Sequence, residues 1–298
     1  MSETSTPERA PETIDTALGP VEIERAGEGP PVLVVHGTPG GSDQALAMGR
    51  FLVDAGFETI APSRPGYLGT PLDDARAAID AQADLHAALL DALGHPHAGV
   101  LAWSGGGPSS YRLAIRHPER VSALVVAAGV SQPFAPDAAN IDERLMMDTR
   151  AGNWLLRFLA AHAPKTTVSS TLGAEGDLSR KELRERTKAV VGDERQTELV
   201  LAMAAAASDH AHRAAGIDND LARFAELESL ELERIGVPTL IVGGDADSDV
   251  PPAHSDHAAA TIPGAEHIVL SRGTHLALWV HPEAEATQAR AAALLRTS

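Results

Sequence analysis

The stretch LAWSGGGPSSYRLAIRHPERV, residues 101–121, decides the fold of this protein. It opens with the end of an apolar run that begins at Ala98, and Ser104 follows that run directly. A helical pattern begins after the glycines and ends near residues 117–120. Small residues, Ala102 and Gly106, flank the serine two positions before and two after. We therefore predict a serine on a tight turn between a buried strand and a helix.

The chemistry of such a turn explains its residue types. A larger side chain at either small position would clash with the adjoining strand or helix. The turn holds the Ser104 hydroxyl clear of the sheet. It also aims the backbone N–H of Gly105 at the place where an oxyanion would form, near a helix start that favours negative charge. The simpler alternative is an ordinary helix N-cap, since serine is common there.

Strands alternate with helices on both sides of this stretch, which is typical of βαβ units and a mostly parallel sheet. The expected strands are residues 21–26, 31–37, 57–62, 98–103, 121–129, 237–244 and 267–270. The expected helices are residues 44–56, 73–93 and 254–260, a helix that follows the glycines after Ser104 and stops near residues 117–120, and a last helix starting near residue 283.

The alternation stops between residues 131 and 234, where the pattern is helical. We interpret residues 1–12 as a disordered polar tail, 13–130 as the first part of an α/β core, 131–234 as a helical cap insertion and 235–298 as the second part of the core. A separate middle domain is disfavoured because one sheet needs the strands on both sides of the insertion.

Three other loops follow predicted strands. HGTPGG occupies residues 36–41, GGDADSDVPP occupies 243–252 and RGTHLAL occupies 272–278. Together with the serine turn, these segments resemble the α/β-hydrolase superfamily over about residues 20–298, apart from the insertion. The resemblance implies an α/β-hydrolase fold, with a mostly parallel sheet flanked by helices and a helical cap. Ala102 is a mild departure, since glycine is commoner at that position of the family's nucleophile elbow.

The resemblance assigns roles by register. Ser104 is the expected nucleophile, Asp247 the acid and His275 the base, in the chain order Ser, Asp, His that this fold uses. The backbone N–H groups of Thr38 and Gly105 are the expected oxyanion hole. A modest, largely uncharged acyl or alkyl pocket is expected under the cap, whose apolar residues lie in 145–159 and 199–207.

Neighbouring residues compete for two of these roles. Asp245 and Asp249 lie in the same loop as Asp247, so the acid is assigned on motif register alone. His254, His257 and His281 are rivals of His275, although we place them on helices away from the strand ends.

For three further residues near the motifs we expect structural roles. His36 is expected to anchor the oxyanion loop through hydrogen bonds, Trp103 to pack, and Arg64 to shape its turn.

No cofactor and no metal are expected. The spacing of Asp245, Asp247 and Asp249 superficially resembles a calcium-binding EF-hand loop, but Val250 occupies the position that needs glycine. The glycine clusters match neither a dinucleotide-binding fingerprint nor a phosphate-binding loop.

Composition narrows the class of partner. The 298 residues carry a formal net charge of −17, so nucleic acid and anionic membranes are disfavoured and a small molecule is expected. There is no cysteine, which excludes disulfides, thiolate metal sites and a cysteine nucleophile. No apolar run is long enough to span a bilayer and the chain lacks the basic start typical of a secretory signal, so a cytoplasmic location is expected. The oligomeric state stays open.

The sequence therefore predicts a serine hydrolase of the carboxylesterase type, acting on a small, mostly uncharged ester through an acyl-enzyme. Alternatives are an aminopeptidase of the prolyl iminopeptidase type, an acyltransferase and a non-catalytic ligand-binding relative. The fuller iminopeptidase signatures are absent. Dehalogenase and epoxide hydrolase chemistry would need an aspartate at position 104.

Overall fold

The structure is a computed structural model and describes residues 10–135 and 163–296. Within them the strands form one sheet in the order β1-β2-β4-β3-β5-β6-β7-β8. Strand β2 pairs antiparallel with both β1 and β4, and every other neighbouring pair is parallel. The strands are β1 (Glu12–Thr16), β2 (Gly19–Ala26), β3 (Pro31–Val35), β4 (Glu58–Pro62), β5 (Ala98–Trp103), β6 (Val121–Ala127), β7 (Thr239–Gly244) and β8 (Glu266–Leu270).

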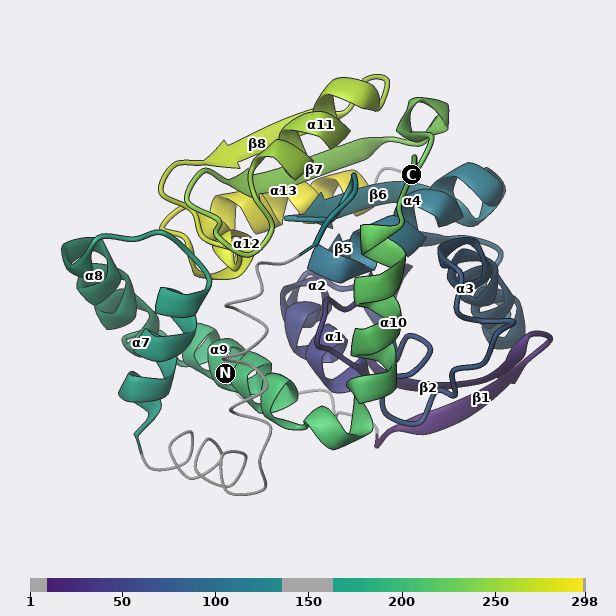
Figure 1. Cartoon of the computed structure of the whole chain (residues 1–298), viewed down its shortest axis with the longest axis horizontal. Helices are drawn as coiled ribbons and strands as arrows, with labels where there is room; N and C mark the ends of the chain where they lie inside the picture. The colour runs from purple at the N-terminus through teal and green to yellow at the C-terminus, as the bar shows by residue number, and fades with distance from the viewer. Residues whose placement is uncertain (1–9, 136–162, 297–298) are drawn as a thin grey trace.

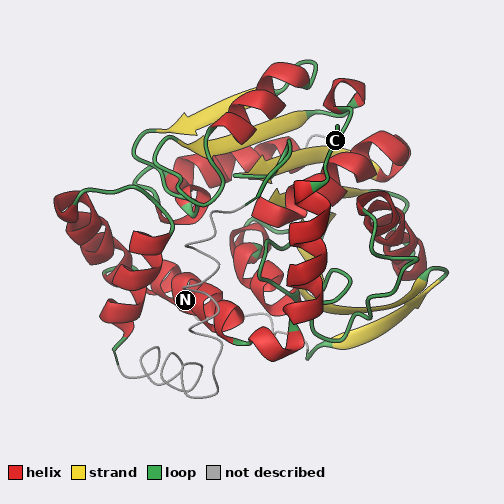
Figure 2. Ribbon diagram, in the orientation of Figure 1, coloured by secondary structure: helices red, strands yellow, loops and turns green. Residues whose placement is uncertain are grey.

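Helices cover both faces of this sheet (Figure 2). One apolar layer packs the sheet against α1 (Ser42–Met48), α2 (Arg50–Asp54), α12 (Ala277–Val280) and α13 (Ala284–Arg296). The other packs it against α3 (Ile79–Leu93), α4 (Gly107–Arg116) and α11 (Ala253–Thr261). Central strands such as β5 are buried on both faces, which explains their unbroken apolar sequence. The predicted fold class is confirmed.

The insertion contributes four helices among its described residues: α7 (Pro164–Ala174), α8 (Arg180–Val191), α9 (Glu194–Ser208) and α10 (Ala214–Ala225). Helix α8 begins at a capping box formed by Ser179 and Glu182, and the Asp193 side chain caps α9. Helices α7 to α9 form a group beside the sheet, whereas α10 runs in front of β5 and α1 (Figure 1).

Several predicted boundaries were wrong for local reasons. The helix predicted over 44–56 is two short helices that meet at Gly49, where a Cβ atom would lie 2.6 Å from the Thr59 side chain. The helix predicted from residue 73 begins only at Ile79. The Asp73 carboxylate accepts the Arg76 backbone N–H in a turn of its own, and Ala78 is extended.

The N-terminal boundary also differs from the expectation. Strand β1 begins at Glu12, the last residue that we assigned to the tail, and the sequence analysis missed this strand altogether. Its residues alternate between half-buried and exposed, as expected at a sheet edge. Across residues 10–135 and 163–296, no helix has both the length and the apolar character that a bilayer crossing requires.

Candidate active site

Ser104 lies in a strained turn at the carboxyl end of β5. Its backbone has φ of 53°, in the left-handed region that side chains rarely adopt. The turn is packed on all sides, because a Cβ atom on Gly106 would lie 2.6 Å from the carbonyl oxygens of Val35 and His36. The predicted need for a small residue two positions after the serine therefore has a direct steric cause.

The three predicted triad residues lie within hydrogen-bonding distance of one another. Ser104 Oγ is 2.8 Å from His275 Nε2, and His275 Nδ1 is 2.8 Å from Asp247 Oδ2. All three side chains are buried. The serine comes from the end of β5, the aspartate from the loop after β7 and the histidine from the loop after β8. Parallel strands bring these loops to one edge of the sheet.

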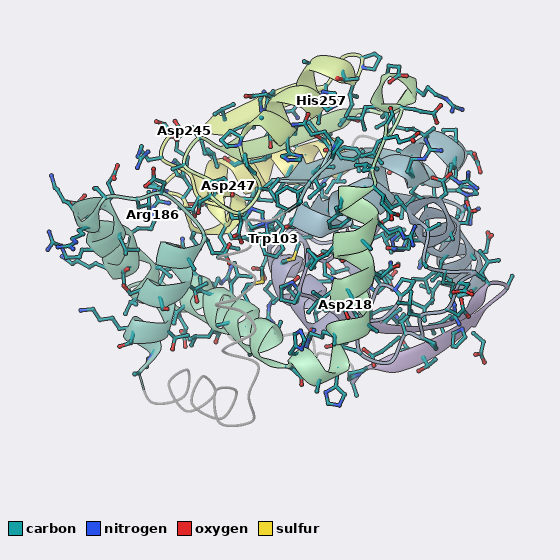
Figure 3. All side chains as sticks on the ribbon, viewed as in Figure 1. Trp103, Arg186, Asp218, Asp245, Asp247 and His257 are labelled. Atoms are coloured by element: carbon teal, nitrogen blue, oxygen red, sulfur yellow. The ribbon has the colours of Figure 1, made fainter. Side chains whose placement is uncertain are left out.

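The loop after β7 places its three aspartates in different surroundings. Asp247 is buried, and its Oδ1 atom accepts the backbone N–H groups of Asp249 at 2.9 Å and Val250 at 3.0 Å. These bonds leave Oδ2 directed at the imidazole. Asp245 is exposed and accepts the backbone N–H of Arg272, at the outer side of the loop (Figure 3). The geometry therefore favours Asp247 among the three candidates.

The other histidines have partners elsewhere. His254 Nδ1 accepts the backbone N–H of Ser131 at 3.2 Å, and His281 Nε2 donates to the Ser271 carbonyl at 2.9 Å. His257 lies on α11, near the Thr261 hydroxyl (Figure 3). None of these three is bonded to Ser104.

Electrostatics at His275 favour its charged form. Burial is the largest single influence and lowers the pKa of His275, but the carboxylates of Asp247, Asp249 and Glu175 together raise it by more. The resulting pKa is about 9. Glu175, at the end of α7, also accepts the His275 backbone N–H through its carbonyl at 2.9 Å. The insertion therefore contacts the loop that carries His275 directly.

Glu175, Asp249 and His275 are also the described residues that come close enough to share a metal ion, with one ligand atom of each within 4.8 Å of the others. Both ring nitrogens of His275 already face Ser104 and Asp247. A metal ion here would have to displace one of those contacts, so the grouping fits the hydrogen-bonded arrangement better than a metal centre.

The aromatic residue beside the serine packs as expected. The Trp103 ring lies 4.8 Å from the His275 ring, centroid to centroid, and its indole N–H donates to the His275 carbonyl at 3.0 Å. Trp103 points toward the interior between the sheet and the insertion (Figure 3). It therefore supports the histidine loop from the side of β5.

The predicted oxyanion loop lies against the elbow. A Cβ atom on Gly105 would fall 2.2 Å from the Thr38 hydroxyl oxygen, so the two segments are in close contact. His36 anchors the loop as expected: its Nδ1 atom is 2.7 Å from the Gly37 carbonyl, and its Nε2 atom accepts the Arg64 backbone N–H at 2.9 Å. Thr38 and Gly105 thus lie beside Ser104, where the sequence placed them.

A cavity of about 270 Å³ opens above the serine. Ser104, Thr38 and Gly105 form its floor, and most of the remaining walls are apolar. The walls are Val130, Pro133, Phe134, Ala135, Leu221, Phe224, Ser248, Asp249, Val250 and Pro251. Among the described lining residues, Asp249 is the only charged one.

The cap residues that we predicted for this pocket either lie outside the described residues or pack elsewhere. Residues 145–159 lie outside the described part of the chain. On α9, Leu199, Val200 and Met203 are buried in the apolar layer that includes α1, and do not line the cavity. Among its described residues, the insertion reaches the cavity at its start, through Pro133, Phe134 and Ala135, and through α10, which contributes Leu221 and Phe224.

Known proteins of one family resemble this chain in sequence and in structure. The sequence profile of the alpha/beta hydrolase fold family matches residues 30–282. This chain is a member of the α/β hydrolase fold family. A solved α/β hydrolase fold protein from Nakamurella multipartita is 51% identical, with a TM-score of 0.93 over 96% of this chain and 99% of that one.

Two curated relatives are more distant. An uncharacterized hydrolase, YcgS, of Bacillus subtilis is 27% identical over 94% of this chain and 96% of its own. The pimeloyl-(acyl-carrier protein) methyl ester esterase of Aeromonas hydrophila is 26% identical over 88% of this chain and 95% of its own. This α/β hydrolase therefore matches relatives along nearly their whole length.

Sequence reasoning missed one buried carboxylate of this α/β hydrolase. Asp220, on α10, is bonded to Arg64, Tyr67 and Thr38 beneath the oxyanion loop. Arg64 was expected only to shape its turn, and its buried partner was not anticipated. The local sequence held no usable signal, because Asp218 lies two residues away on the same helix and is exposed (Figure 3).

Proposed function

We propose that this protein is a serine hydrolase that cleaves a carboxylic ester of a small, mostly uncharged substrate through an acyl-enzyme. The observation that carries the proposal is the continuous Ser104–His275–Asp247 hydrogen-bonded chain, which ends at a cavity lined by both apolar and polar residues. Two relatives that match along nearly their whole length, a hydrolase and a methyl ester esterase, support the same class of reaction.

In the proposed reaction, neutral His275 accepts the Ser104 proton as Oγ attacks the ester carbonyl carbon. The Oγ–C bond forms, and the carbonyl electron pair moves onto oxygen. Asp247 orients the imidazole and stabilises the imidazolium. The Thr38 and Gly105 N–H groups are assigned to the oxyanion.

The tetrahedral intermediate collapses as His275 gives its proton to the leaving alkoxide, and the acyl group stays on Ser104. Water then attacks the acyl carbon while His275 accepts its proton. The acyl–Oγ bond breaks, the serine regains a proton and the carboxylic acid leaves. Another alcohol in place of water would make the same acyl-enzyme an acyltransferase.

The cavity supports the choice of substrate. Its apolar walls favour a short acyl or alkyl group, and Asp249 disfavours a carboxylate beside the serine. A neutral ester therefore suits the described walls better than an anionic one.

The decisive test compares the wild type with Ser104→Ala on a panel of short-chain p-nitrophenyl esters. We expect hydrolysis by the wild type and at least a thousandfold loss in the variant, roughly the size of effect that removal of a triad member has. Labelling by a fluorophosphonate probe should likewise require Ser104. Folded wild type that neither hydrolyses the panel nor takes the label would favour the non-catalytic ligand-binding alternative.

One observation favours a second candidate, an aminopeptidase. The carboxylate of Asp249 lines the cavity beside Ser104, where it would attract the free amine of a substrate. Activity on proline β-naphthylamide, abolished by Asp249→Asn and unaccompanied by ester hydrolysis, would reverse the ranking.

A further inference from the structure

The carboxylate of Asp220 lies at the centre of a buried polar cluster. We call Thr38, Arg64, Tyr67 and Asp220 the Asp220 cluster. Asp220 Oδ2 accepts the Thr38 hydroxyl at 2.5 Å, the Tyr67 hydroxyl at 2.5 Å and Arg64 Nη2 at 2.6 Å. Asp220 Oδ1 accepts Arg64 Nη1 at 2.8 Å. Arg64 and Asp220 are 1% and 2% exposed, so water does not compete for these bonds.

The cluster joins three segments that are distant in sequence. Thr38 lies in the loop after β3, Arg64 and Tyr67 lie in the turn after β4, and Asp220 lies on α10 of the insertion. Arg64 Nη2 also donates to the Gly37 carbonyl at 3.1 Å and to the Thr38 hydroxyl oxygen at 3.0 Å. The oxyanion loop is therefore held from the core and from the insertion at once.

The charges in the Asp220 cluster determine which groups donate hydrogen bonds and which accept them. Burial and the Asp220 carboxylate raise the pKa of Tyr67 well above its ordinary value, so this hydroxyl stays protonated and donates. The Arg64 charge is matched by Asp220 inside the protein. Tyr67 donates its single proton to Asp220, and Arg64 donates to the Thr38 hydroxyl oxygen. Asp220 Oδ2, at 2.5 Å, is then the nearest acceptor for the Thr38 proton.

The Thr38 hydroxyl is also the atom that approaches the elbow. It occupies the space that a Cβ atom on Gly105 would need, at 2.2 Å. Rotation of the Thr38 side chain or a shift of its loop would therefore change the spacing between residue 38 and the residue after Ser104. These are the two positions whose N–H groups are assigned to the oxyanion.

We propose that Asp220 is a positioning residue, which holds the Thr38 hydroxyl so that the oxyanion loop keeps its place against the Ser104 elbow. The inference rests on the proposed function, because it assigns a purpose to the loop in ester cleavage. Asp220 touches no reacting atom in this scheme. It acts through Thr38, and the insertion thereby becomes part of the catalytic arrangement rather than only a cover over the cavity.

The test uses isosteric changes on both sides of one hydrogen bond. Thr38→Val removes the hydroxyl but keeps the backbone N–H, and Asp220→Asn removes the anionic acceptor. We expect each to lower kcat on a short-chain p-nitrophenyl ester by about tenfold to a hundredfold, the size expected when a reacting group is displaced by about 1 Å. KM should change less than about twofold, and the double variant should lose little more than either single one.

Two further variants serve as controls. Thr38→Ser keeps the hydroxyl and should restore most of the lost kcat. Asp218→Asn makes the same change two residues away on α10, at an exposed side chain, and should leave kcat and KM unchanged.

A second readout follows the oxyanion itself. A trifluoromethyl ketone adds Ser104 Oγ to its carbonyl carbon, the carbonyl electron pair moves to oxygen and the serine proton goes to His275. Its affinity should fall in Thr38→Val and Asp220→Asn by the same factor as kcat. The affinity for the matching secondary alcohol, which forms no oxyanion, should stay unchanged.

The outcomes separate the two proposals. Failure of Ser104→Ala to abolish hydrolysis would overturn the proposed function and this inference with it. Ser104-dependent hydrolysis with wild-type kcat and ketone affinity in Thr38→Val would overturn the positioning role alone. Equal loss of ketone and alcohol affinity would also overturn it, since that indicates a general collapse of the cavity. If Asp220→Asn fails to fold, Thr38→Val still tests the positioning role, because this variant leaves the Arg64–Asp220 pair intact.

Discussion

Arg64 and Asp220, 156 residues apart in the chain, form a buried two-point ion pair, with Nη1–Oδ1 at 2.8 Å and Nη2–Oδ2 at 2.6 Å. Both charged groups are buried and bond to residues inside the protein. Loss of one partner would leave the other charge buried without compensation, which is costly. The pair therefore links the stability of the core to the docking of α10, and it does so directly beneath the oxyanion loop.

Asp220→Ala should lower the free energy of unfolding by about 3–5 kcal/mol, because it strands the Arg64 guanidinium. Asp218→Ala, on the exposed face of the same helix, should change it by no more than about 0.5 kcal/mol. Urea unfolding followed by circular dichroism measures both. Equal stability of the two variants would show that the buried pair contributes nothing to folding.

The proposed ester hydrolysis should decline with falling pH over an unusually high pH range. Neutral His275 is required as the base, and its pKa is about 9, so kcat/KM should rise with pH up to about that value. Rates are read at the isosbestic wavelength of p-nitrophenol, with Ser104→Ala as the blank for spontaneous hydrolysis. A profile already flat above pH 7 would contradict the electrostatic account of this site.

The same profile tests the neighbouring carboxylates. Asp249→Asn removes a negative charge that favours the imidazolium, so the pKa of His275 should fall and the midpoint should move to lower pH. Asp245→Asn makes the identical change on the exposed side of the same loop and should leave the midpoint in place. A midpoint that moves equally in both variants would point to a change in the loop rather than to local charge.

The steric requirement at the elbow can be measured through stability. Gly106→Ala would place a Cβ atom 2.6 Å from two backbone carbonyl oxygens, which cannot move independently of β3. We expect a loss of about 1–3 kcal/mol, the usual range for an overpacked interior site. Gly236→Ala, where a Cβ atom meets nothing within 4 Å, is the matched control and should be nearly neutral. An unaffected Gly106→Ala protein would refute the packing argument.

Acyl-chain preference tests the assignment of the cavity. Leu221 is a half-buried wall residue, and Leu221→Ala should make room for a longer acyl group. The ratio of kcat/KM for the hexanoate over the acetate p-nitrophenyl ester should rise about tenfold, as expected for a few methylene groups. Leu201→Ala, on α9 and outside the cavity lining, should keep the wild-type ratio. If this ratio rose equally in both variants, the cavity would not be the site that binds the acyl group.

Much of this molecule could be predicted from short stretches of sequence. Apolar runs, together with the alternating pattern of residues 21–26, identified seven of the strands, and the small residues around Ser104 identified the elbow, because these patterns reflect local sterics and burial. The missed strand, β1, lies at a sheet edge and carries the weaker alternating pattern. Helix ends were misjudged where a single residue intervened, as at Gly49 and Ala78.

Within the candidate site, register placed Asp247 in the triad, but only geometry separated it from Asp245 and Asp249. The decisive contacts are the backbone N–H bonds to its Oδ1 atom, which direct Oδ2 at His275. The three aspartates alternate along one loop, so no pattern in their spacing reveals which of them turns inward.

The sequence by itself determined the alternation of strands and helices, the order Ser104, Asp247, His275 and the loops that carry them. These features are set by residue size, hydrophobicity and turn geometry within a few positions along the chain. The tertiary structure alone decided that Asp220 meets Arg64 and Thr38, and that α9 packs on the core while α10 borders the cavity. Such pairings depend on the path of the chain through space, because a buried charge is stabilised by whichever partner the fold brings within reach.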